Sequence, residues 1–140
     1  MIASKKVFIA PDALITFIDR ADSKHIHSSA FFRYFGQGGY QLYTDIISIN
    51  YAYDKIFKDI SPSVAKDFLR AMIISSFNIL YPDESDMKAT IKILAADQSA
   101  ELAFSKALMA VFCNRRSIPQ ICTFEYLHPL FGLQLFYLPI

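Results

Sequence analysis

The stretch KKVFIAPDALITFIDRADS, from Lys5 to Ser23, reads as a short strand that runs directly into a helix. Its strand, KVFIA, is apolar after the lysine, which is typical of a strand covered on both faces of a sheet. Pro11 suits the first turn of a helix, and the apolar residues of ALITFI recur at helical spacing. The stretch therefore predicts the opening unit of an α/β fold, with Ala10 where the strand meets the helix.

The same alternation of short apolar strands and helices continues along the chain. Further strands are predicted at YQLYT, FNILYP and PQICTF, and a fifth at GLQLFYL. Ser23 is expected to cap a helix that runs to about Phe35 and is closed by GQGG. Thr44 or Asp45 is expected to cap the next helix, IISINYAYDKIFKDI. Three more helices are predicted, one starting at Ser61-Pro62, one over ESDMKATIKILAAD and one over AELAFSKALMAVFCNRR. In the helix after Pro62, the side chains of Phe68, Met72 and Ile73 are expected to face the core.

Non-alternating apolar strands separated by helices indicate a parallel sheet with helices on both faces. The predicted fold class is therefore α/β, with three layers (α/β/α) around a central, mainly parallel sheet of four to five strands. In such sheets the working cleft lies beyond the carboxyl ends of the strands. Ala10, residues 44–50 and residues 123–126 are expected to line it.

Length and composition favour one domain over residues 1–140. A chain of 140 residues can bury a core without disulfides or a metal, and its mean hydropathy of +0.28 lies at the apolar end of the soluble range. The longest uncharged apolar segment, from Tyr126 to Ile140, contains His, Pro, Gly and Gln, and the N-terminal run VFIA is short for a signal peptide. We expect a cytoplasmic protein without a membrane span.

Charge, cysteine and histidine patterns point to no other class of site. Residues 1–70 carry nine Lys and Arg against seven Asp and Glu, and residues 71–140 carry five against six, so any nucleic-acid binding must be local. Cys113 and Cys122 stand in apolar runs without metal-ligand spacing and are expected to be buried free thiols. His25 and His27 fall on different faces of a helix, and His128 precedes a proline, so none is assigned as a metal ligand or base.

Four segments in order resemble the motifs of the PIN domain, the small Mg²⁺- or Mn²⁺-dependent ribonuclease fold known from VapC-type toxins. FIAPDAL matches the opening pattern F-[IV]-D-T-S-A-L, and YTDIISINYAY matches the helix that carries the second acidic residue. AFSKALMAVFCNRRSIPQICTF matches the S-F-x-D-A-L helix, and TFEYLHPLFGLQLFYLP matches T-F-D followed by G-F-x-x-L. The resemblance spans about Val7 to Pro139 and is most specific from Phe104 to Phe136.

The resemblance implies an active site in which three or four carboxylates hold divalent cations. At the acidic positions of the family stand Ala10, Asn50, Lys106 and Glu125, so three of the four carboxylates are missing. Asn50 offers a carbonyl oxygen without charge, and Lys106 brings a cation that would repel a metal ion. We therefore expect no metal cofactor and a non-catalytic protein that binds or scaffolds another protein or RNA.

Two interpretations of Lys106 stay open. Its ammonium group extends into water while its stem packs on the helix, or it occupies the vacated metal position and pairs with Glu125 or Asp12. Lys106, Arg115 and Arg116 are also the candidates for phosphate contacts, although two arginines at a helix end complement the helix dipole as well.

An alternative hypothesis retains an enzyme, the ribonuclease toxin of a toxin-antitoxin pair. Its displaced Mg²⁺ or Mn²⁺ site would use Asp12 and Glu125, with or without Asp45. Asp12 has a competing explanation as a first-turn helix residue, and Asp45 as a helix cap. A third hypothesis is a structural subunit of a larger assembly.

The partner implied by the resemblance is a second copy of the chain. A group of aromatic residues outnumbers what one core face requires, so part of the group is expected to form a surface for self-association or for a protein partner. The group is Phe31, Phe32, Tyr34, Phe35, Tyr51, Tyr53 and Phe57.

Overall fold

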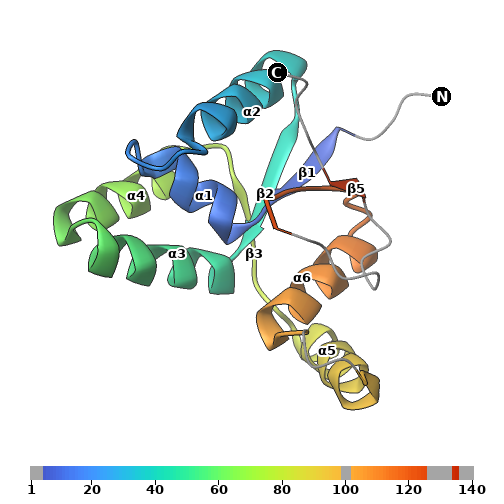
Figure 1. Ribbon diagram of the computed structural model, residues 1–140. Helices are drawn as coiled ribbons and strands as arrows, with labels where there is room; N and C mark the ends of the chain where they lie inside the picture. The colour runs from blue at the N-terminus through green and yellow to red at the C-terminus, as the bar shows by residue number, and fades with distance from the viewer. Residues whose placement is uncertain (1–4, 99–101, 126–133, 136–140) are drawn as a thin grey trace.

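The computed structural model describes residues 5–98, 102–125 and 134–135, and it confirms the α/β prediction (Figure 1). The elements in chain order are β1 (Lys6–Ile9), α1 (Pro11–Ile18), α2 (His25–Gly38), β2 (Gln41–Asp45), α3 (Ile46–Asp59), α4 (Pro62–Ile74), β3 (Asn78–Leu80), α5 (Glu84–Ala96), α6 (Phe104–Arg115), β4 (Gln120–Cys122) and β5 (Gln134–Leu135). No helix within these residues is long and apolar enough to cross a membrane.

The strands form one parallel sheet in the order β3-β2-β1-β4-β5. β1 is central, with Phe8 opposite Tyr43 of β2 and Ile121 of β4. Because neighbouring strands run in the same direction, β1, β2 and β4 all end at one edge of the sheet. The predicted fifth strand is present at Gln134–Leu135, and the rest of GLQLFYL lies outside the described residues.

Alternate residues of β1 enter two different cores, which confirms the three layers. Val7 and Ile9 pack in one cluster with buried side chains of α1, α2, α3 and α4. Phe8 and Ala10 pack in a second cluster with α6 and with Met87 of α5. Figure 1 accordingly shows α1 to α4 on one side of the sheet and α5 and α6 on the other.

α6 is buried almost all round, as its sequence predicts. Every side chain from Ala107 to Cys113 is buried, because α6 packs between the sheet on one side and α5 on the other. α5 packs mainly against α6 and projects from the rest of the molecule in Figure 1. Most side chains of the second core, the cluster around Phe8, therefore come from α6.

Several predicted boundaries are wrong, each for a local reason. Ser23 does not cap α2, because the preceding segment folds into a turn in which Asp22 accepts a hydrogen bond from the Lys24 N–H and the helix begins at His25. The helix also continues beyond Phe35 to Gly38, and Gly39, whose φ is 69°, supplies the left-handed C-cap conformation. α6 begins only at Phe104, because the N-cap residue Ala103 is extended.

Ile73 does not face the core, in contrast to the prediction. It follows the buried Met72 by one position, which turns its side chain about 100° away from the apolar stripe of α4, and it is 79% exposed. Ile74 is 86% exposed, so α4 ends with two adjacent apolar side chains in water.

Asp45 caps α3, as the sequence predicts. One carboxylate oxygen accepts the Ser48 N–H at 2.8 Å, the other accepts the Ser48 hydroxyl at 2.9 Å, and the residue is only 2% exposed. Burial raises the pKa of Asp45, although the bonds from Ser48 lower it in part. The cap fixes the start of the helix that follows the second strand of the sheet.

Replacing Asp45 with alanine should lower the free energy of unfolding by about 1–2 kcal/mol, because a buried helix N-terminus loses its acceptor. Asp45→Asn keeps one acceptor oxygen and should retain most of that stability. Urea unfolding of the three proteins at pH 7 measures the difference. Equal losses in both variants would show that the charge, rather than the cap, is what stabilises α3.

Candidate functional site

A cleft of about 450 Å³ lies at the carboxyl edge of the sheet, where the parallel arrangement predicted it. Its walls come from the junction of β1 and α1, from the face of α3, from the first half of α6 and from the segment after β4. Ala10, Lys106 and Glu125 all line this cleft, so three of the four positions named from the sequence come together.

Ala10 lies in the floor of the cleft. Its N–H donates to the carbonyl of Cys122 at 3.1 Å, and its side chain is 2% exposed. The residue is the N-cap of α1 and has no side-chain acceptor. A methyl group therefore stands at the point where β1, β4 and the start of α1 meet.

Lys106 and Glu125 form an ion pair across the cleft. The Lys106 ammonium donates a hydrogen bond to Oε2 of Glu125, and the two side chains are 33% and 54% exposed. Lys106 belongs to the first turn of α6, whereas Glu125 follows β4 by three residues. Of the two interpretations of Lys106, the structure contains the pairing with Glu125.

Asp12 holds the segment that carries Glu125. Its carboxylate accepts the Thr123 hydroxyl at 2.8 and 3.0 Å and the Phe124 N–H at 2.7 Å. The Thr123 oxygen in turn accepts the Glu125 N–H at 3.1 Å. Asp12 therefore joins the first turn of α1 to the chain after β4. Sequence reasoning missed this role. The signal was the Thr123-Phe124 pair, whose hydroxyl and N–H are donors directly after the strand.

The surroundings of Asp12 disfavour its charge. Burial raises the pKa of Asp12, the hydrogen bonds from Phe124 and Thr123 lower it in part, and the negative charge of Glu125 raises it further. Asp12 and Glu125 both line the cleft, close enough for the charge of one to act on the other. Two acidic side chains converge there, but each already has partners within the protein.

Asn50 and Asp45 do not line the cleft. Asn50 is exposed on α3, and both carboxylate oxygens of Asp45 accept bonds from Ser48. The face that α3 turns to the cleft instead presents Ile47, Ser48, Tyr51 and Lys55. Sequence reasoning missed Tyr51 and Lys55, although the spacing of 47, 51 and 55 indicates one helix face.

Comparisons with known proteins agree with this geometry. No protein-family model and no curated protein matches the sequence. Among solved structures, the fold is similar to that of Mycobacterium tuberculosis VapC20, with a TM-score of 0.75 over 85% of this chain and 89% of that chain. The chain has a PIN-like fold. The two sequences share 10% identity, so the likeness concerns the fold, and cleavage of the sarcin-ricin loop is a property of VapC20.

The side chains of this PIN-like cleft do not fit a hard divalent cation. Such an ion requires several oxygen ligands that have no other strong partner. Of the two cleft carboxylates, Glu125 contacts an ammonium group, and Asp12 accepts hydrogen bonds from two donors, the Thr123 hydroxyl and the Phe124 N–H. In the described part of the chain, no group of three or more His, Cys, Asp or Glu side chains is placed to hold a metal.

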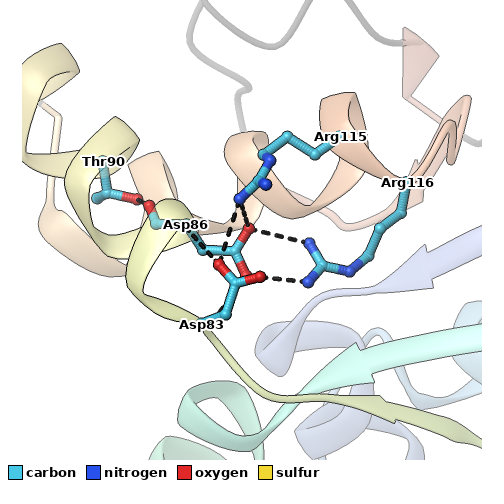
Figure 2. Close-up of polar contacts among 5 residues, drawn as sticks. All are labelled: Asp83, Asp86, Thr90, Arg115 and Arg116. Atoms are coloured by element: carbon cyan, nitrogen blue, oxygen red, sulfur yellow. Dashed lines mark hydrogen bonds and ion pairs between the residues drawn. The ribbon is translucent and has the colours of Figure 1, made fainter.

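Arg115 and Arg116 lie away from the cleft of the PIN-like fold and contact α5. Figure 2 shows both guanidinium groups directed at the buried carboxylate of Asp86, with Asp83 beside it. Arg116 donates to the two Asp86 oxygens at 3.2 and 2.9 Å, and Arg115 donates to Asp86 and to Asp83. Their charges therefore fasten α5 to α6 rather than extend freely into water.

Asp83 and Asp86 also form the start of α5. The Asp86 N–H donates to Asp83 at 2.7 Å and the Asp83 N–H donates to Asp86 at 3.0 Å, a reciprocal capping box. Burial raises the pKa of Asp86, but hydrogen bonds from Arg116 and Asp83 and the charges of both arginines outweigh it and lower the pKa to about 2. Asp86 is therefore ionised over the whole physiological range.

Both cysteines are buried free thiols, as predicted. Burial raises the pKa of Cys113 and of Cys122 to about 12. His25 contacts the Thr16 carbonyl at 3.0 Å through Nδ1, which anchors the start of α2. His128 lies outside the described residues.

Asp86→Ala should lower the free energy of unfolding by about 3 kcal/mol at pH 7, because two guanidinium groups lose a buried carboxylate. A lowered pKa means that this stabilisation is complete above about pH 4 and disappears as the pH falls toward 2. Urea unfolding from pH 7 to pH 2 should therefore show the free energies of unfolding of the wild type and of Asp86→Ala converging as the pH falls.

Asp67→Ala is the matched control, because Asp67 makes a single ion pair with Arg70 and its side chain is 69% exposed. That change should alter stability by less than about 1 kcal/mol. Equal effects at positions 67 and 86 would contradict the assignment of Asp86 as the joint between α5 and α6.

Proposed function

We propose that the chain is a cytoplasmic, non-catalytic PIN-like domain that binds or scaffolds a protein or RNA partner. One observation carries the proposal. The cleft that would hold a metal ion contains the Lys106 ammonium group, which is paired with the carboxylate of Glu125. A metal would have to displace Lys106 from Glu125 and then tolerate its charge nearby.

Two further features support a cleft without a metal. Ala10 presents a methyl group where a carboxylate would have to stand, and Asp12 is occupied with Thr123 and Phe124. Without an ion to polarise a phosphodiester or to activate water, the remaining groups supply no ready nucleophile at neutral pH. Catalysis of the ribonuclease type is therefore not part of the proposed function.

The competing function is a metal-dependent ribonuclease with a displaced site at Asp12 and Glu125. The observation in its favour is that the two carboxylates lie near enough for the charge of Glu125 to raise the pKa of Asp12. It requires Lys106 to leave Glu125, and Asp12 to exchange protein donors for a cation. A second observation in its favour is that VapC20, the toxin of similar fold, cleaves the sarcin-ricin loop.

Thermal unfolding in the presence of Mn²⁺ separates the two functions. For the wild type we expect no rise of the unfolding midpoint at millimolar Mn²⁺. In Ala10→Asp with Lys106→Asp, two new carboxylates join Glu125, and the midpoint should rise by about 3 °C or more with Mn²⁺. Adding Asn50→Glu should change little, because Asn50 does not line the cleft.

The control is Asp12→Asn in the wild-type background. A Mn²⁺-dependent rise in the wild type that Asp12→Asn abolishes would overturn the proposal in favour of the ribonuclease. Failure of a folded Ala10→Asp, Lys106→Asp variant to bind Mn²⁺ would show that the cleft differs from a metal site in shape as well as in charge.

The partner proposed first is a second copy of the chain. An apolar groove between α1, α2 and α4 is lined by Phe17, Phe32, Phe77 and other apolar side chains. Ile73 and Ile74 follow the groove residue Met72 directly and are almost fully exposed. Covering the groove and the two isoleucines beside it would remove apolar surface from water, which favours association through this end of α4.

Light scattering during gel filtration should therefore give about twice the chain mass of 15.9 kDa for the wild type. Ile73→Ser with Ile74→Ser should shift the protein to the monomer mass, because the two most exposed isoleucines of the proposed interface become polar. Ile91→Ser is the control, since Ile91 is 55% exposed on α5, away from the groove. A wild type that remains monomeric at high concentration would contradict the homodimer.

A further inference from the structure

The α3 wall of the cleft carries Lys55 and Tyr51, which take no part in the ion pair between Lys106 and Glu125. Tyr51 and Lys55 are separated by one turn of α3, so they project from the same face and both line the cleft. Tyr51 is 55% exposed, and among residues 5–98, 102–125 and 134–135 the ion-pair partner of Lys55 is the exposed Asp59, at 3.4 Å. Such a pair contributes little, so the Lys55 ammonium is available to a ligand.

The opposite wall already holds an oxyanion. There the Glu125 carboxylate bonds to Lys106 in the first turn of α6, whose N-cap residue Ala103 offers no side-chain acceptor. Glu125 is 54% exposed at its side chain, and its backbone is fixed through Thr123 and Asp12. Its carboxylate can therefore swing into water while the segment that carries it stays in place.

We infer that the cleft binds a small phosphate monoester with a ring in its organic part, and that its phosphate replaces the Glu125 carboxylate on Lys106. This inference rests on the proposed function, because a metal ion would occupy the same space. A phosphate has three acceptor oxygens and up to two negative charges, so it can bond to Lys106 more strongly than the single charge of Glu125 does, and Lys55 adds a second positive charge to the same cleft.

The remaining walls suit the organic part of such a ligand. The Tyr51 ring offers a flat surface for stacking, and Ala10, Ile47 and Met109 provide apolar contact. A volume of about 450 Å³ is within the range of small-molecule sites. The displaced ion pair is partly exposed, so replacing it costs little. Glu125 therefore acts as a built-in competitor that a phosphate can displace.

Isothermal titration with adenosine monophosphate at low salt and pH 7.5 tests the inference. We expect measurable binding to the wild type and at least a tenfold loss in Lys106→Met. Glu125→Gln should bind about two- to fivefold more tightly, because the competing carboxylate is gone. Inorganic phosphate should bind more weakly, and Tyr51→Leu should weaken only the nucleotide.

Glu84 and Lys88 supply controls with the same change of net charge, because they form an exposed ion pair on α5, outside the cleft. Glu84→Gln and Lys88→Met should bind the nucleotide as the wild type does. Equal affinities of Glu125→Gln and Glu84→Gln would overturn the inference, because a general change of charge would then explain the gain. Lys55→Met, expected to weaken binding, serves as a second variant if Lys106→Met does not fold.

Absence of nucleotide binding in both the wild type and Glu125→Gln would also overturn the inference, and so would binding of a short RNA alone. The proposed function would survive that result, because the outcome that overturns it is a Mn²⁺-dependent rise of the unfolding midpoint in the wild type that Asp12→Asn abolishes. The two experiments therefore give separate answers from the same purified protein.

Discussion

The parallel pairing of β1 with strands on both of its sides is the constraint on which the rest of the structure depends. Because β2 and β4 run in the same direction as β1, all three strands end at one edge of the sheet, and the segments that follow them begin next to one another. The helices α1 and α3 begin there, and the segment with Glu125 begins there too. Alternation of side chains along β1 also divides the core into the two clusters that flank the sheet.

At this edge the protein satisfies its polar groups internally. The Asp12 carboxylate takes donors from Thr123 and Phe124, and the Lys106 ammonium takes the carboxylate of Glu125. Buried or half-buried charges require such partners, and a metal ion is one way to supply them among several. In a PIN-like fold with Ala10 at the floor of the cleft, hydrogen bonds and one ion pair supply them instead.

The sequence contained enough to predict the layers, the parallel sheet and the location of the cleft, because buried strands and helix periodicity are local patterns. It also indicated the pairing of Lys106 with Glu125 as one of two possibilities. The roles of Tyr51 and Thr123 depend on which side of a helix faces the sheet edge and on how a loop folds over Asp12. Neither is encoded in spacing alone.

Some local predictions failed where two neighbouring signals competed. Ser23 is a suitable cap, but the turn held by Asp22 moves the start of α2 to His25. Ile73 continues an apolar run, but the stripe of α4 has already rotated past it. The function itself is harder to predict. Ala10 and Lys106 indicate that the cleft lacks metal-binding carboxylates, but the groups that could bind a ligand there follow only from how the other cleft side chains are arranged.

The joint between α5 and α6 has a dynamic consequence. Only Asp86 and Thr90 of α5 are fully buried, and Met87 is partly buried against the second core, so α5 contributes less apolar area than the helices on the other face of the sheet. Directional bonds from two arginines hold it instead, and such bonds are lost together once the helix tilts away. α5 therefore forms a unit that opens at a lower free energy than the whole molecule, and its backbone amides should exchange with solvent deuterium before those of β1.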